Sequence, residues 1–463
     1  MEKQRIRTNP DGTKRALSNR HVQLIAIGGT IGTGLFLGAG STITKTGPSI
    51  LVVYAVLGLF FFLMMRAIGE MFYSDPSQHT FVSFISRYLG PAAGKFSGWT
   101  YWVGLVFVGM AELTAVATYV QYWVPGVPAW IIEIVFLAVL TTINLVAARL
   151  FGEAEFWFAM VKIIAIIMMI VIGIYMVVTH FKTPTGTATF SNITSGYALF
   201  PKGISSFVAA FPMVFFAFQG IEFVSITIGE TKEPRTVLKK AINETLFRIL
   251  IFYIGALVVI MSIIPWRSLT ASQSPFVQVF QLAGLPAAAA VINFVVLTAA
   301  ASALNSVIFS AGRHFYQLAT EASEKSWVHR HFGIISRNGV PAAAILISAG
   351  FVLITPIMSL SHGLLAVFTI VTSISSDMYL IVYTMAMLAH RRYRASADFL
   401  PTGFKMPGYR VTSVATILFF AVIFVSLFFI SGDAIPAVGA IIWTLVFGGW
   451  CYLEEQRSVV VNK

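Results

Sequence analysis

The chain has 463 residues, of which 57% are hydrophobic and only 11% are charged, and its mean hydropathy is +0.82. A soluble protein cannot bury that much apolar surface, so the composition excludes a soluble globular protein and predicts one polytopic membrane protein. The net charge of +12 does not require a nucleic-acid partner, because membrane proteins concentrate Lys and Arg in their cytoplasmic loops.

Cysteine and histidine usage argues against a redox or metal enzyme. Cys451 is the only cysteine, which excludes an intrachain disulfide and a cysteine metal cluster. The eight histidines lie in loops or near the ends of apolar segments, whereas a haem or di-iron centre would need histidines at membrane depth. We therefore expect no enzyme activity, no metal and no cofactor apart from a coupling ion.

The chain begins with a basic segment and continues with about twelve apolar ones. Residues 1–21 contain six Lys and Arg and no apolar core closely followed by a cleavage site, so we interpret them as a cytoplasmic tail. The apolar segments are long enough to cross a bilayer as helices, and residues 454–463 follow as a second tail. The approximate spans are 22–44, 49–72, 96–123, 129–147, 156–178, 206–229, 245–264, 276–319, 340–358, 363–389, 411–431 and 434–453.

The first span is interrupted by glycine. Gly28, Gly29, Gly32 and Gly34 surround Thr30, Ile31 and Thr33. Each glycine in a helix interior costs about 1 kcal/mol relative to alanine, so a continuous helix is unfavourable here. Unwound backbone inside a membrane is tolerated where it lines a protected cavity. The alternative is close helix packing through small residues, which the spacing of Gly28 and Gly32 also fits.

The sixth span is interrupted at a matching place, by Gln219 and Gly220 after Phe216, Ala217 and Phe218. Breaks in corresponding spans of two halves are the sequence pattern that indicates a transporter binding site. Half-helix N-termini offer N–H groups to a carboxylate, and half-helix C-termini offer carbonyl groups to an ammonium. An α-amino acid carries both groups on one carbon.

Lys and Arg are distributed unevenly between the two sides of the predicted bundle. If residues 1–21 are cytoplasmic, 26 of the 31 basic residues lie on the inner side, four lie on the outer side, and Lys162 lies within a span. This asymmetry predicts that both termini are cytoplasmic and that spans one and six run in opposite directions. Opposite directions are what an inverted repeat requires.

Ionisable residues at membrane depth are costly and point to function. Lys162 in span five can exchange a proton or supply a fixed charge, or else extend to the cytoplasmic surface. Glu222 follows the span-six break and is a candidate gate or proton relay, or a hydrogen-bond partner of exposed backbone. Glu112 in span three is a candidate relay or pocket wall. Two others are Glu133, which we interpret as interfacial, and Asp377, which has no evident partner.

Aromatic side chains flank the span-six break. Phe216 and Phe218 can close over a small apolar side chain and occlude the site, although either can also serve packing alone. We therefore expect the substrate site to comprise Gly28, Gly29, Thr30, Ile31, Gly32, Thr33, Gly34, Phe216, Ala217, Phe218 and Gly220, with Lys162, Glu222 and Glu112 in gating or proton coupling.

At these residues the chain resembles the bacterial amino-acid permease family of the amino acid–polyamine–organocation superfamily. The matching stretches run in order through nearly the whole chain: residues 17–21, 28–36, 46–48, 69–70 with Pro76, 151–158, 216–222 and 302–306. Within that family, residues 274–277, 284–289 and 291–298 look most like D-serine/D-alanine/glycine transporters. Gln219, where a small apolar residue is usual, and Asp377 depart from the pattern.

The resemblance implies an all-α membrane protein of about 12 transmembrane helices with LeuT-like inverted five-helix repeats. Repeat one would cover about 22–178 and repeat two about 206–389 of a single permease domain, 22–453, with extra helices in 411–453. It also implies backbone binding of the carboxylate at residues 28–34 and of the amino group at residues 216–220. By resemblance to the wider superfamily, Phe216 would act as an occluding gate, Lys162 would take the place of a sodium ion, and Glu222 would match a gating carboxylate.

The predicted function is proton-coupled symport of a small neutral amino acid, such as alanine, serine, glycine or threonine in D- or L-form, by alternating access. The alternatives are an amino-acid exchanger and a permease for a larger neutral or a cationic amino acid, the last because Asp377 could pair with a cationic side chain. The expected partners are the amino acid and the lipid bilayer, with no nucleic acid and no obligate protein. The expected location is a bacterial cytoplasmic membrane.

Overall fold

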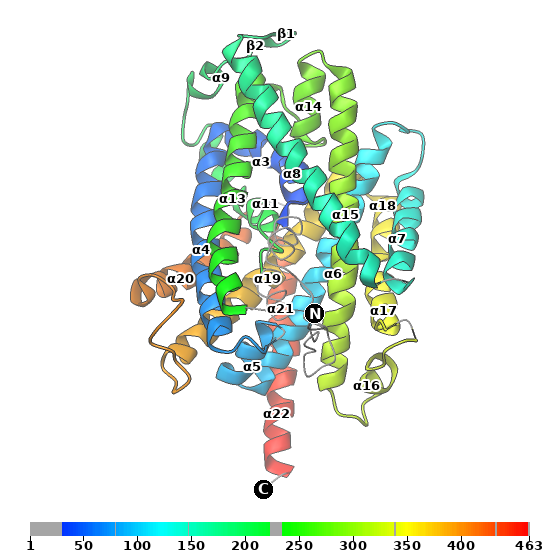
Figure 1. The fold of residues 1–463 in the computed structure, drawn as a ribbon, viewed down its shortest axis with the longest axis vertical. Coiled ribbons are helices and arrows are strands. Elements are labelled where there is room, and N and C mark those ends of the chain that lie inside the picture. Colours follow the sequence, from blue (N-terminus) through cyan, green and yellow to red (C-terminus); the bar gives the residue numbers. More distant parts are fainter. Residues whose placement is uncertain are drawn as a thin grey trace, which may run out of the picture.

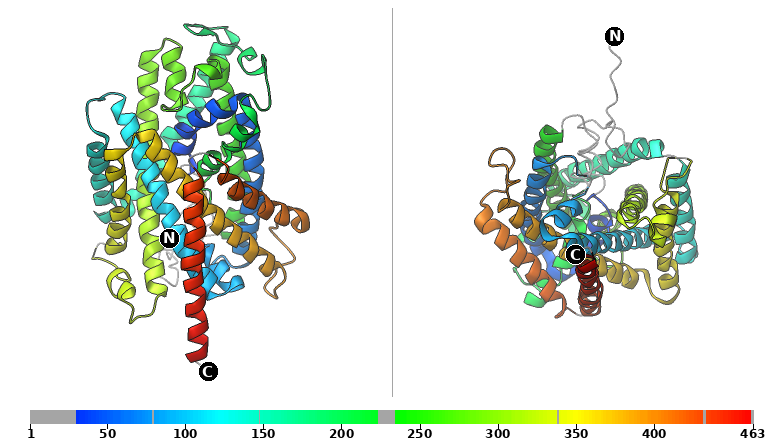
Figure 2. Two further views of the ribbon diagram at one scale, coloured as in Figure 1. Left: turned by 180° about the vertical axis from the view of Figure 1, so that it is seen from behind. Right: turned by 90° about the horizontal axis from the view of Figure 1, so that it is seen from below.

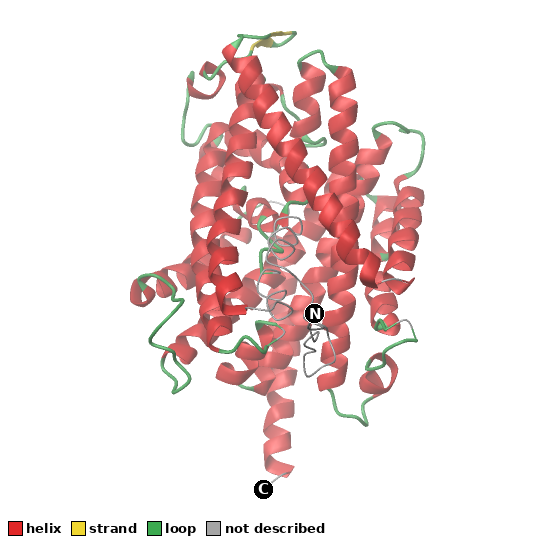
Figure 3. Ribbon diagram, viewed as in Figure 1, coloured by secondary structure: helices red, strands yellow, loops and turns green. Residues whose placement is uncertain are grey.

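Long apolar helices form almost the whole of the computed structural model, which describes residues 30–78, 80–146, 148–222, 234–337, 339–430 and 433–461 (Figure 3). Ten helical segments in this part are long and apolar enough to cross a membrane. Their helices are α4 (Ile50–Ser74), α6 (Pro91–Gln121), α7 (Ala129–Val146), α8 (Ala148–Val178), α13 (Pro234–Ile263), α15 (Pro286–Glu321), α17 (Ala342–Val352) with α18 (Ile354–Ser361), α19 (Leu364–Arg394), α20 (Tyr409–Leu427), and α21 (Ala434–Trp443) with η3 (Thr444–Gly448) and α22 (Gly449–Val461).

These ten segments correspond to predicted spans two to five and seven to twelve. The two remaining spans are broken, as the glycine pattern predicts. Span one contains α2 (Thr33–Phe36) and α3 (Gly38–Thr46), and η1 (Gly47–Ser49) joins it to α4. Span six contains α10 (Gly203–Val208) and α11 (Phe211–Ala217). The predicted all-α fold class is therefore confirmed.

Short elements cover the two ends of the bundle (Figure 1). At one end lie the antiparallel pair β1 (Lys182–Thr183) and β2 (Gly186–Thr187), with α9 (Ser191–Thr194), η2 (Trp266–Ser268) and α14 (Pro275–Leu282). At the other end lie α5 (Val82–Leu89), α16 (Trp327–Phe332) and the end of α22. The long segment 276–319 divides between α14 and α15, because Gly284 turns the chain with φ +78° before Pro286.

Burial separates central helices from peripheral ones. In the most apolar stretches of α6 and α19, 72% and 67% of residues are buried, and the two helices pack on each other (Figure 2). The corresponding fraction is 22% in α7 and 28% in α20, where large apolar side chains such as Val422 are exposed. The peripheral helices thus present the apolar surface that a bilayer covers, and α2 and α11 lie among the central ones.

Candidate functional site

The break in span one lies at Ile31 and Gly32, immediately before α2. Gly32 has an extended backbone and leaves the first N–H groups of α2 without an internal partner. The N–H of Thr33 donates instead to Oε1 of Glu112 on α6, at 3.2 Å. Glu112 is only 3% exposed. The N-terminal end of α2 therefore binds a carboxylate in this structure, and that carboxylate belongs to the protein itself.

Two glycines permit close approach at this break. A Cβ atom at position 32 would lie 2.5 Å from Oε1 of Glu112, so glycine leaves room for that carboxylate. A Cβ atom at position 34 would lie 2.4 Å from Cα of Ala217, so glycine lets α2 touch α11. Small residues in span one therefore serve close packing as well as unwinding, and at Gly34 the packing brings the two broken spans together.

The break in span six begins where α11 ends, at Ala217. The chain turns through residues 218–220, and Gly220 has φ +92°, a conformation that glycine adopts without steric cost. The carbonyl group of Ala217 accepts a hydrogen bond from the hydroxyl of Tyr253 on α13, at 2.8 Å. The same hydroxyl lies 2.9 Å from the carbonyl oxygen of Thr30 in span one.

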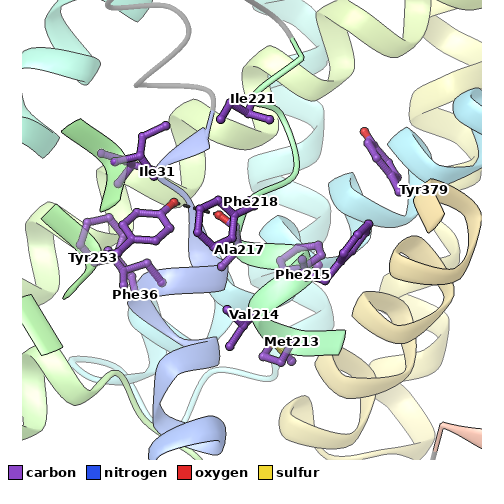
Figure 4. Packing of buried hydrophobic residues seen from close by; sticks show 14 of the residues in the cluster. Ile31, Phe36, Met213, Val214, Phe215, Ala217, Phe218, Ile221, Tyr253 and Tyr379 are labelled. Carbon is purple, nitrogen blue, oxygen red and sulfur yellow. Dashed lines mark hydrogen bonds between the residues drawn. The ribbon is translucent and has the colours of Figure 1, made fainter. Parts of the chain in front are cut away.

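Tyr253 thus links the two breaks (Figure 4). A hydroxyl has one hydrogen, so it donates to one of the two carbonyl groups at a time. The residue is fully buried, and its ring packs against Tyr54 at 5.6 Å. Sequence reasoning missed it, because one tyrosine among 15 in an apolar chain carries no local signal.

Glu222 holds the span-six break from within the same segment. Its Oε2 accepts hydrogen bonds from the N–H of Gly220, at 3.0 Å, and from the hydroxyl of Tyr383 on α19, at 2.6 Å. Its Oε1 accepts one from Tyr101 on α6, at 2.9 Å. The side chain is fully buried. The expected bond to exposed backbone is present, together with two tyrosine contacts that the sequence did not indicate.

A small cavity lies between the breaks. Its volume is about 20 Å³, which is room for about one water molecule. A molecule of the size of an amino acid would fit this cavity only after the surrounding helices had moved apart. The lining side chains and backbone come from both breaks and three neighbouring helices: Thr30, Gly32, Gly34, Leu105, Val108, Glu112, Phe216, Gln219, Gly220, Ala303, Val307 and Tyr379.

The two aromatic residues of the break have different surroundings. Phe216 lines the cavity and meets Phe368 edge-on, with ring centroids 6.2 Å apart. Phe218 stacks on Phe61 at 5.0 Å and packs against Tyr253, and it is not among the residues that line the cavity. Of the two predicted covering residues, Phe216 therefore borders the cavity, whereas Phe218 packs away from it.

Lys162 on α8 is fully buried, so its side chain does not extend to the surface. Its charge interacts with Glu112, the residue that occupies the N-terminal end of α2. Two of the three predicted gating or coupling residues therefore belong to one electrostatic group beside the span-one break. The third, Glu222, belongs to the span-six break.

The two departures from the family pattern lie close together. The amide oxygen of Gln219 accepts a hydrogen bond from Ser375 on α19, at 2.7 Å, and its nitrogen lies 3.5 Å from the hydroxyl of Ser376. Asp377 follows directly, fully buried, and neither of its carboxyl oxygens has a hydrogen-bond partner among the described residues. Asp377 is not among the residues that line the cavity.

The remaining predicted residues are placed as follows. Gly28 and Gly29 lie outside the described residues. Ile31, Thr33 and Ala217 are buried at the breaks without lining the cavity. Glu133, which we interpret as interfacial, lies in the first turns of α7, where its side chain is fully buried against α18 and its Oε1 accepts a hydrogen bond from Ser359 at 2.9 Å.

Comparison with known proteins shows the family to which the chain belongs. The model of the family "Amino acid permease" matches residues 21–449. The chain is 48% identical over 446 residues to DL-alanine permease SerP2 of Lactococcus lactis subsp. cremoris, with 96% of each chain covered. It is 46% identical to serine permease SerP1 of the same organism, over 96% of this chain and 98% of the relative. It is 41% identical to the D-serine/D-alanine/glycine transporter of Escherichia coli K12, over 97% of this chain and 96% of the relative.

These matches cover nearly the full length of the chain and include both broken spans. They confirm the predicted fold, with its LeuT-like broken helices, and the prediction that the protein transports and does not catalyse. The chain belongs to the amino acid permease family.

Proposed function

We propose that this protein is a proton-coupled importer of small neutral amino acids such as alanine, serine, glycine or threonine, in D- or L-form. The observation that carries the proposal is the small cavity between the N-terminal end of α2 and the C-terminal end of α11. Beside this cavity, the start of α2 has N–H groups and the end of α11 has carbonyl groups that lack partners within their own helices. The opposed partial charges of these two helix ends complement a zwitterion.

The substrate carboxylate would take the place that Glu112 now occupies at the N–H of Thr33. The substrate ammonium would lie at the carbonyl groups that end α11, where Ala217 already accepts from Tyr253. Carbonyl oxygens have two lone pairs, so such a group can accept a second hydrogen bond. Phe216 would close over the bound molecule, since its ring already lines the cavity.

The rest of the lining favours a small neutral side chain. Leu105, Val108, Ala303 and Val307 are apolar, and Gln219 adds one amide. Among the described residues that line the cavity, Glu112 is the only charged one, and we assign it to the carboxylate end. The names of three relatives include alanine, serine or glycine. A cationic substrate would need Asp377, which does not line the cavity.

Proton coupling would act through Glu112 and Lys162. When the substrate carboxylate displaces Glu112 from the N–H of Thr33, Glu112 loses its hydrogen bond in a buried place. An uncompensated buried carboxylate is costly, so binding a proton relieves it. Lys162, whose charge acts on Glu112, would set how readily that proton is taken up and released. Substrate and proton would then cross together.

The proposed orientation rests on charge. The excess of Lys and Arg on one side supports an orientation in which both termini are in the cytoplasm of a bacterial cell, and α5, α16 and the end of α22 would then be on the inner side. The outer side would carry β1, β2, α9 and α14. Rocking of one helix bundle against the other would then expose the central cavity alternately to each side.

The test is uptake of labelled alanine by membrane vesicles with an imposed proton gradient. Unlabelled D- and L-forms of serine, threonine, leucine and lysine compete, with and without a proton ionophore. We expect competition by serine and threonine, little by leucine and lysine, and loss of accumulation with the ionophore. Competition by lysine as strong as by serine would refute the substrate class. Counterflow with no accumulation under any gradient would identify an exchanger instead.

A further inference from the structure

A second and larger cavity lies beside α3, α11 and α19. Its volume is about 180 Å³, compared with about 20 Å³ for the cavity between the breaks. Met213 lines the larger cavity, and Phe216, one turn later on α11, lines the smaller one. Met213 also packs against Gly38 of α3, where a Cβ atom would lie 2.6 Å from its sulfur. The two side chains on one face of α11 therefore separate the cavities.

The larger cavity has the size of the proposed substrate. A protein cavity of about 150 Å³ holds benzene, which has six non-hydrogen atoms. Alanine also has six non-hydrogen atoms, and serine has one more. The cavity between the breaks, in contrast, holds about one water molecule in this conformation. A small amino acid thus fits the larger cavity without any movement of helices.

Two opposite charges line this cavity. Lys45 near the end of α3 uses one N–H to donate to the carbonyl of Ala209, at 3.4 Å, and an ammonium group has three such donors. Asp433 before α21 is 6% exposed, and its Oδ1 accepts a hydrogen bond from Ser373 on α19. Within the described part of the chain, the other carboxylate oxygen accepts no hydrogen bond and can accept one from a ligand.

The two charges face one cavity without forming a pair. Lys45 and Asp433 are both described residues and interact electrostatically, yet their charged atoms are more than 4.0 Å apart. A direct ion pair would fill the space between them. A separated pair leaves one anion-binding and one cation-binding group across a cavity of amino-acid size.

We propose that this cavity is a second amino-acid site, in which Lys45 binds the carboxylate and Asp433 binds the ammonium of the same small neutral substrate. The inference rests on the proposed function. The orientation agrees with that at the central cavity, because span one supplies the carboxylate partner in both places, through Lys45 of α3 and the N–H of Thr33 of α2. A substrate can therefore pass Met213 and Phe216 without reversing its ends.

The experiment is equilibrium binding of labelled alanine to the purified full-length protein in lipid nanodiscs. We expect about two molecules bound per wild-type chain, and about one for Lys45→Met and for Asp433→Asn. Lys45→Arg keeps the charge and should retain both. The matched control is Lys182→Met, on the β1–β2 hairpin at the same end of the bundle, which should also retain both.

Gly34→Ala provides the complementary variant, since it blocks the central contact and should leave only the Lys45–Asp433 site occupied. One molecule per wild-type chain would overturn the second site. So would two molecules in folded Lys45→Met and Asp433→Asn, or loss of both sites in either. These outcomes are independent of the uptake assay, in which failure of the proposed function appears as absence of alanine accumulation by the wild type.

Discussion

The two breaks differ in how their exposed backbone is satisfied. In span one, the N–H of Thr33 is bonded by Glu112, which comes from another helix and lies 79 positions away in the sequence. In span six, the N–H of Gly220 is bonded by Glu222, two residues further on. Both carboxylates are buried, but Glu222 accepts three hydrogen bonds, whereas Oε2 of Glu112 accepts none among the described residues.

This difference indicates that the two breaks have different roles in the site. Of the three hydrogen bonds of Glu222, one holds the N–H of Gly220 and the other two tie the span-six break to α6 and α19, so its geometry is built into the fold. One hydrogen bond to the described residues holds Glu112 at the span-one break, so a ligand carboxylate has a single bond to displace, and a proton bound by Glu112 would offset the loss. We infer that span six provides the fixed half of the site and span one the exchangeable half.

The largest effect is expected from Gly34→Ala, which forces the two halves apart. The new Cβ would lie 2.4 Å from Cα of Ala217, and backbone cannot yield as a flexible side chain can. Overpacking of this kind costs about 1–3 kcal/mol, so alanine affinity should fall by up to about 100-fold in a binding assay. The control is Gly350→Ala in α17, where a Cβ meets nothing within 4 Å. If Gly34→Ala and Gly350→Ala bound alanine with equal affinity, the contact between the two breaks would not be needed for substrate binding.

The second-largest effect is expected from a change in the exchangeable half of the site, at the span-one break. Lys162→Ala removes the charge that acts on Glu112, so proton-driven accumulation of alanine should be lost while counterflow persists. The measurement is vesicle uptake with a proton gradient, followed by counterflow without one. Accumulation at the wild-type level would exclude Lys162 from coupling.

A third variant addresses the fixed half. Glu222→Ala leaves the N–H of Gly220 and the hydroxyls of Tyr101 and Tyr383 without their acceptor. Each buried group left unpaired costs about 1–3 kcal/mol, so the thermal unfolding temperature should fall clearly. Glu222→Gln keeps one acceptor and should fall less. Glu112→Ala removes only one bond and is the matched comparison. If it destabilised the protein as much as Glu222→Ala, the two halves would not differ as proposed.

The smallest effect is expected where the two halves are linked. Tyr253→Phe keeps the ring and removes the hydroxyl that lies between the carbonyl groups of Thr30 and Ala217. One neutral hydrogen bond contributes about 1 kcal/mol, so we expect alanine affinity to fall about fivefold with folding retained. An unchanged affinity would reduce Tyr253 to a packing residue.

The comparison also shows what the sequence could predict. Glycines and loss of helix-forming pattern mark both breaks, and charge asymmetry assigns their directions, because these signals are local or summed along the chain. Glu222 is found for the same reason, since it lies two residues from Gly220. The sequence does not predict the contact of Glu112 with Thr33 or the contacts of Tyr253 with both breaks. These contacts depend on how α6 and α13 pack against segments that are distant in the sequence.

The sequence also could not predict the direction in which individual side chains point. Phe216 and Phe218 are two residues apart in the same turn, yet one lines the cavity and the other packs on Phe61. Glu133 near a span end is buried against Ser359 of α18, because that helix covers it. The pairing of Gln219 with Ser375 shows that one departure from the family pattern is accommodated by α19, which no single segment reveals.

The central claim is that a substrate carboxylate replaces Glu112 at the N-terminal end of α2. An experimental structure with alanine bound tests it directly. We predict the alanine carboxylate within about 3 Å of the N–H of Thr33 or its neighbours, the ammonium at the carbonyl groups ending α11, and Glu112 withdrawn. Alanine bound at the breaks with the Glu112–Thr33 hydrogen bond intact would contradict the account.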